Sequence, residues 1–156
     1  MTATDAIATM PATTPFRSTD EVRALVLAFE DTSLPYRQWT HAAHLTVGLW
    51  YRLWYGPDEA MNRMRTGLRR YNAAHANEPM RVGYHETITR FWLWVIDEYV
   101  RETDVGGSIA DFANALIAAR VNRELPFQYY SREHLMSGAA RAAWVEPDVR
   151  ALGTKK

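Results

Sequence analysis

Apolar residues recur along this chain at steps of three and four, the spacing that places them on one face of a helix. The first helix is predicted over 18–31, because Ser18 is followed three residues later by Glu21, as in a capping box. Its buried face would consist of Val22, Leu25, Val26 and Phe29. Further helices are predicted over 40–55, 57–75, 84–101, 109–121 and 131–144, with proline or glycine in the breaks between them.

The segment 40–55 is apolar around nearly its whole circumference, and Arg52 is its single charged residue. A helix of this kind is typical of the centre of a bundle. Gly48 would let a neighbouring backbone or a ligand approach closely, because glycine has no Cβ. Gly56 and Pro57 are predicted to end this helix and to start the next one.

These patterns predict an all-α fold, a single-domain antiparallel bundle of five to six helices. The connections between the first four helices are short, and short connections make neighbouring helices antiparallel. Residues 1–17 are predicted to be a disordered N-terminal tail, 18–145 the helical domain, and 146–156 a C-terminal tail.

The composition agrees with one folded domain and argues against some classes of binding partner. The 156 residues are 47% apolar and 12% aromatic, enough for a sizeable core. The formal net charge of zero argues against nucleic acid as a partner, and the apolar surplus allows a homodimer without requiring one. Because the chain shows no secretory signal and no run of eighteen apolar residues, we expect a cytoplasmic protein that does not enter the membrane.

Four of the five histidines fall at helix ends that the antiparallel order brings to one end of the bundle. His41 and His44 open the second predicted helix. His75 closes the third, and His85 lies at the start of the fourth. Two imidazoles at positions i and i+3 share a helix face and can reach the same ion.

The leading hypothesis is a small metalloenzyme in which His41, His44 and His85 hold a divalent transition metal such as zinc, iron or copper. The chain has no cysteine, so any ligand set consists of nitrogen and oxygen donors. Three protein ligands leave a position open for water or a small organic substrate. Glu86 would act as general acid or base, with His75 as a second catalytic candidate.

Aromatic and basic residues near the same end are candidates for contact with a small-molecule substrate. Trp39 and Tyr84 are predicted to form walls of a pocket, and Arg90 is predicted to bind substrate there. Asn122 and Arg123 could likewise bind a substrate carboxylate, or could lie on the surface.

Each of these residues also has an ordinary structural interpretation. The histidines could be buried side chains that are hydrogen-bonded to backbone carbonyls, and His75 continues a core-facing row. Glu86 could pair with Arg90 one helical turn away. Two other functions stay open: a metal-free isomerase or lyase that uses histidine and glutamate as acid and base, and a non-catalytic module that binds a small ligand.

Two familiar metalloenzyme patterns are absent. The Glu-x-x-His pairs of carboxylate di-iron bundles do not occur, and Thr89 stands where the second histidine of a His-Glu-x-x-His protease motif would be. The segments WTHAAHL (39–45), RRYNAAH (69–75) and GYHETITRFWL (83–93) resemble a pattern found in uncharacterised bacterial helical proteins. The resemblance implies a single helical domain and carries no activity with it.

Overall fold

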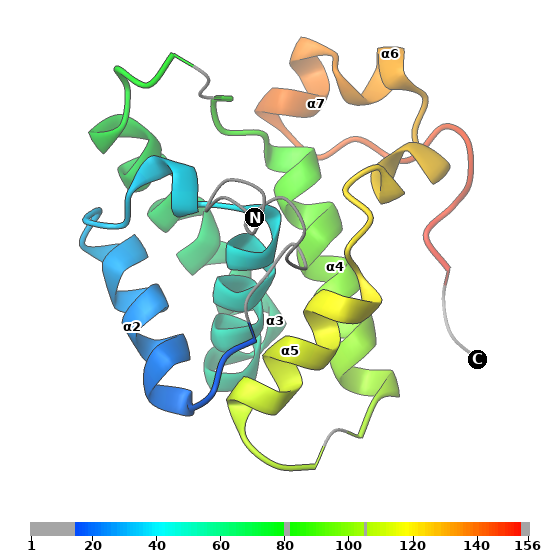
Figure 1. Ribbon diagram of the computed structural model, residues 1–156. Coiled ribbons are helices and arrows are strands. Elements are labelled where there is room, and N and C mark those ends of the chain that lie inside the picture. The colour runs from blue at the N-terminus through cyan, green and yellow to red at the C-terminus, as the bar shows by residue number, and fades with distance from the viewer. Residues whose placement is uncertain (1–14, 80–81, 105, 154–156) are drawn as a thin grey trace, which may run out of the picture.

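The computed structural model describes residues 15–79, 82–104 and 106–153, and every regular element within these ranges is a helix. In chain order the elements are α2 (Thr19–Glu30), η1 (Tyr36–Gln38), α3 (His41–Ala74), α4 (Glu86–Glu102), α5 (Ile109–Ala119), η2 (Leu125–Gln128), α6 (Arg132–Leu135) and α7 (Gly138–Ala142). Figure 1 shows one bundle in which α3 lies at the centre, between α2 and the α4 and α5 pair. The predicted all-α, single-domain bundle is therefore confirmed.

Helix α3 reverses its direction at Gly56, which divides it into a first arm (41–55) and a second arm (57–74). Gly56 has φ 81° and ψ 172°, a backbone conformation open to glycine, and Pro57 then suits the first turn of the second arm. The rings of Trp39 and Tyr71 lie 5.4 Å apart, so the second arm ends beside the start of the first. The two arms are antiparallel, as the sequence predicts.

The first arm packs against helices on several sides, which explains why it is apolar all round. Leu45 and Leu49 belong to a cluster that includes buried residues of α2, α4 and α5, whereas Val47 faces a second cluster formed with α2 and the second arm. A Cβ added at Gly48 would lie only 2.6 Å from Cδ1 of Ile96 in α4. The predicted close approach at Gly48 is thus made by the neighbouring helix.

Two of the predicted helices differ in the structure: one begins later, and one is divided into two. Helix α4 begins at Glu86 and not at 84, because the ring of His85 caps it from outside. The segment predicted as one helix over 131–144 forms two short helices, since the hydroxyl oxygens of Ser131 and Ser137 accept from the backbone N–H of His134 and Ala140 and start a helix each. Serine competes with the helical backbone for hydrogen bonds, so a serine inside a helical pattern can restart it.

Parts of the two predicted terminal tails are hydrogen-bonded to the helical domain. Asp148 accepts hydrogen bonds from both the backbone N–H and the hydroxyl of Ser131, and the N–H of Val149 donates to the carbonyl of Tyr129 at 3.0 Å. At the other end, the N–H of Phe16 donates to Oδ1 of Asn114 at 2.8 Å. The rest of the predicted N-terminal tail, residues 1–14, lies outside the described residues.

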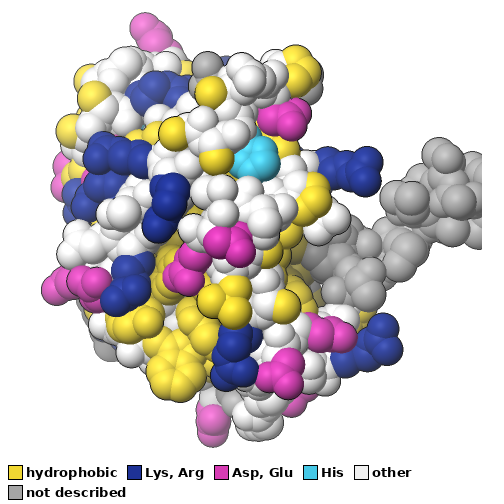
Figure 2. All heavy atoms as spheres, turned by 90° about the vertical axis from the view of Figure 1, so that its left-hand side faces the viewer, with side chains coloured by type: hydrophobic (Ala, Val, Ile, Leu, Met, Phe, Trp, Pro, Cys, Tyr) yellow, Lys and Arg dark blue, Asp and Glu magenta, His cyan; other side chains and the backbone are white. Residues whose placement is uncertain are grey.

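The outer surface on the α2 side mixes both signs of charge. Figure 2 shows this face, with acidic and basic side chains interspersed and hydrophobic side chains gathered in the lower half of the view. Arg23 pairs with Asp20 at 2.9 Å, and Arg63 pairs with Glu59 at 3.2 Å. Among the described residues, no helix combines the length and apolarity that a membrane span requires.

Candidate functional site

A pocket of about 580 Å³ opens at the end of the bundle where α3 and α4 begin. Its walls come from the start of the first arm, the end of the second arm, the start of α4 and the segment that follows α5. A volume of this size suits a small organic molecule. His41, His44 and His85 all line it, together with Trp39 and Tyr84, so the predicted meeting of these chain segments at one end is confirmed.

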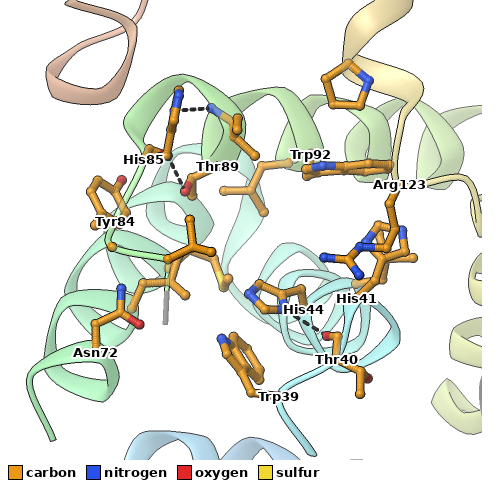
Figure 3. A pocket seen from close by; sticks show the side chains of 18 of the residues that line it. Trp39, Thr40, His41, His44, Asn72, Tyr84, His85, Thr89, Trp92 and Arg123 are labelled. Atoms are coloured by element: carbon orange, nitrogen blue, oxygen red, sulfur yellow. Dashed lines mark hydrogen bonds between the residues drawn. The ribbon is translucent and has the colours of Figure 1, made fainter. Parts of the chain in front are cut away.

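The wall is mainly apolar and rich in aromatic rings. Aromatic residues on it are Tyr36, Trp39, Tyr84, Trp92 and Phe127. Polar side chains on it come from Thr40, His41, His44, Asn72, His85, Thr89 and Arg123. Figure 3 shows Trp39, Tyr84 and Trp92 on different sides of one open space, with the ring of His44 projecting into it. Such a surface would hold a flat apolar body and offer a few directed hydrogen bonds.

His44 is held in one tautomer, and its Nε2 has no hydrogen-bond partner among the described residues. Its Nδ1 lies 2.8 Å from the carbonyl oxygen of Thr40, which can only accept, so Nδ1 carries the proton and Nε2 carries the lone pair. Burial lowers the pKa of His44 to about 4, against an ordinary value of 6.5, so the ring is neutral at pH 7. Trp39 fixes the ring plane, since the two ring centroids lie 3.9 Å apart.

His41, nearly one helical turn before His44, makes a similar hydrogen bond to a backbone carbonyl. Its Nε2 donates to the carbonyl oxygen of Arg120 at 2.9 Å, and its ring meets the edge of Trp92 with centroids 4.6 Å apart. Burial lowers the pKa of His41, and the nearby charge of Arg123 adds to that shift. Nδ1 of His41 therefore also carries a lone pair at neutral pH.

His85 is different because both of its ring nitrogens are occupied. Nε2 donates to the carbonyl oxygen of Leu135 at 2.8 Å, and Nδ1 accepts from the backbone N–H of Ile88 at 3.1 Å. The ring thus caps α4 and ties it to α6. Figure 3 shows it pointing away from the centre of the pocket, and burial lowers its pKa.

The predicted three-histidine metal centre does not fit this geometry. A metal ligand needs the imidazole lone pair, and His85 uses its lone pair to cap α4. Across the ranges 15–79, 82–104 and 106–153, no group of three or more histidine, aspartate or glutamate side chains is arranged to hold a metal ion. The ordinary interpretation, a ring N–H bonded to a backbone carbonyl, describes His41, His44 and His85 alike.

Glu86 lies behind the pocket wall and not on it. Its Oε1 accepts from the hydroxyl of Tyr84 at 2.6 Å and from Nε of Arg65 at 3.0 Å, and its Oε2 accepts from Nη2 of Arg65 at 2.8 Å. This pairing with Arg65 lowers the pKa of Glu86. Both carboxylate oxygens are thus committed to holding Tyr84 and the second arm in place, and they are not positioned for the predicted acid–base role.

His75 and Arg90 also lie away from the pocket wall. Nε2 of His75 donates to the carbonyl oxygen of Thr32 at 3.1 Å, and its half-buried ring lies tilted against Tyr71 with centroids 4.2 Å apart, so it attaches the end of the second arm to the segment after α2. The guanidinium of Arg90 lies over the ring of Trp144, 4.9 Å from its centroid. Neither side chain lines this pocket.

Several residues that line the pocket, among them Asn72, Thr89 and Trp92, were not predicted as site residues from the sequence, and neither was the partner of Glu86. Thr89 lines the pocket one turn after His85, and its hydroxyl donates to the His85 carbonyl at 2.7 Å. Arg65 holds Glu86 from 21 positions away in the second arm. The helical repeat could have indicated Thr89, whereas the partner of Glu86 depends on the register between two helices.

Comparison of the chain with protein-family models, with curated proteins and with solved structures finds no match. The function of the chain therefore has to be inferred from the chemistry of its pocket.

Proposed function

We propose that this pocket binds a small organic molecule with a flat apolar part, and that His44 exchanges a proton with it. The observation that carries the proposal is a neutral imidazole with one free nitrogen, projecting into a pocket of about 580 Å³. The reaction that such a site would catalyse is acid–base chemistry without a metal, as in an isomerase or a lyase.

The walls favour a flat ligand. Trp39 and Trp92 lie on different sides of the space, and Phe127 adds a third ring. Each aromatic contact contributes roughly 0.5–1.5 kcal/mol beyond the burial of apolar area. The hydroxyl of Thr89 and the amide of Asn72 would orient polar groups of the ligand.

The surroundings of His44 suit reversible proton transfer. Nε2 takes the proton from the ligand, and the N–H at Nδ1 keeps its bond to the Thr40 carbonyl, which strengthens as the ring becomes cationic. Burial disfavours the cation, so the ring returns the proton to another position of the ligand or to the leaving group. A base of this kind moves a proton without retaining it.

Acylation by diethyl pyrocarbonate tests whether the nitrogen of His44 is accessible. The reagent attacks the lone pair of neutral imidazoles, so we expect modification of His44 and protection of His85, which serves as a control within the same chain. Peptide mass spectrometry after brief exposure of the folded protein measures both sites. If His44 reacts only after unfolding, the proposed base is not available to a ligand.

Proton transfer itself requires a ligand, which a thermal-shift screen of metabolites would supply. A ligand present at 100 times its Kd raises the free energy of unfolding by about 2.7 kcal/mol. We expect the wild-type protein to introduce solvent deuterium into that ligand and the His44→Gln variant to lose this exchange while it still binds. Binding without exchange, and with unchanged affinity in the variant, would identify a non-catalytic binding module.

A further inference from the structure

Arg123 is the only charged side chain among the described residues that line the pocket. No aspartate or glutamate accompanies it there. Its guanidinium takes part in none of the ion pairs, side-chain hydrogen bonds or ring contacts found within the described ranges. Figure 3 shows the guanidinium beside His41, pointing toward the open space.

Most other arginines of the molecule have a partner within the chain. Arg52 pairs with Asp97 at 2.6 Å, and Arg65 pairs with Glu86. Arg90 lies over an aromatic ring. An arginine that lines the pocket without a counterion is therefore an exception among the paired arginines, and its exposed, solvated guanidinium is available to an anionic ligand.

Other charges near the pocket do not cancel that of Arg123. Helices α3 and α4 both begin at the pocket and direct the positive ends of their dipoles toward it. Glu86, at the start of α4, pairs with Arg65 at 2.8 Å, and Glu124, which follows Arg123 in the chain, lies 3.9 Å from the guanidinium of Arg132. The pocket thus has a positive potential and an apolar wall.

We infer that the ligand of this pocket is a small carboxylic acid whose carboxylate binds the Arg123 guanidinium and whose apolar body lies between the aromatic walls. The inference rests on the proposed function and names its substrate class. The guanidinium presents two parallel N–H donors that match a planar carboxylate. A phosphate monoester carries nearly two charges at neutral pH, and the described wall offers no second cation for it.

The carboxylate would also assist His44. A negative charge bound in the same pocket favours the protonated form of a nearby imidazole. His44 is a weak base in the empty pocket and would become a stronger base when the carboxylate is bound. The same negative charge would then both bind the substrate to Arg123 and favour proton transfer to His44.

Binding of matched probes tests the inference by isothermal titration calorimetry. The probes are phenylacetate, 3-phenylpropionate and indole-3-acetate, each compared with its neutral primary amide of nearly equal shape. We expect the carboxylates to bind about 10-fold to 100-fold more tightly than the amides, as for a hydrogen bond to a charged group. Added salt should reduce this ratio.

Two variants separate a specific contact from a general charge effect. Arg123→Gln should bring each carboxylate to the affinity of its amide. Arg37→Gln removes the same charge from an exposed position of η1 outside the pocket wall and should leave the ratio unchanged.

Each alternative result has its own meaning. Equal binding of acids and amides, with no effect of Arg123→Gln, would overturn the inference and leave the proposed binding of an organic molecule standing. Tighter binding of phenyl phosphate than of every carboxylate would overturn the choice of carboxylate. Failure of all probes at millimolar concentration, with His44 also unreactive toward diethyl pyrocarbonate, would overturn both proposals.

Discussion

The lowered pKa of His44 makes the stability of this protein depend on pH in a calculable way. The folded-state pKa is about 4, and the ordinary value of 6.5 applies to the unfolded chain. The unfolded state therefore takes up a proton first as the pH falls below 6.5. The free energy of unfolding contributed by neutral His44 is fully present above that pH and declines toward pH 4. The expected loss is about 1.4 kcal/mol at pH 5.5 and about 2.5 kcal/mol at pH 4.5.

The variant His44→Gln isolates this effect, because glutamine can donate to the Thr40 carbonyl and does not titrate. Urea unfolding followed by tryptophan fluorescence, at intervals from pH 7.5 to pH 4.5, gives the free energy of both proteins. His85, whose pKa is also lowered, contributes to both proteins and cancels in the difference, whereas His41, whose charge helps to lower the pKa of His44, cancels only in part. We expect the wild-type protein to lose about 2.5 kcal/mol relative to the variant by pH 4.5. A difference that stays constant over this range would refute the lowered pKa of His44 and with it the neutral ring.

Further expectations follow from other contacts. Removal of the helix cap by His85→Ala should cost about 0.5–2 kcal/mol in urea unfolding, and His85→Asn, which can still cap, should cost less. Glu86→Gln should cost about 1.5–3 kcal/mol, and much of this loss should disappear in a double-mutant cycle with Arg65→Gln if the ion pair is its cause. Gly48→Ala should cost about 1–3 kcal/mol through overpacking, whereas Gly138→Ala, where a Cβ meets nothing within 4 Å, should not. Treatment with a chelator should leave the melting temperature unchanged, and a fall that zinc reverses would restore the metal hypothesis.

The position of the site could be predicted from the sequence because it depends on helix order. Apolar spacing indicates where helices lie, and Gly56 with Pro57 marks the reversal between the two arms. Short connections then determine which helix ends share one end of the bundle. Helix order alone therefore predicts the end of the bundle at which His41 and His44 line the pocket.

The chemistry of the site could not be predicted in the same way. A histidine at a helix start is compatible with a metal ligand, a cap or a base, and the choice depends on what each ring nitrogen meets. His85 meets Ile88 and Leu135, the second of which lies 50 residues later in the chain. Glu86 meets Arg65 through the register between two helices. Local spacing carries no information about either contact.

Trp39 belongs to the core and to the pocket at the same time. Its ring lies 4.4 Å from that of Phe29 in α2 and 3.9 Å from that of His44. A ligand that orders Trp39 must therefore also restrict Phe29, although α2 contributes no residue to the described pocket wall. We therefore expect ligand binding to slow the hydrogen exchange of backbone amides in α2. Substitutions in α2 can in turn adjust affinity from outside the pocket, which gives the chain a way to change ligand preference while every residue that contacts the ligand stays the same.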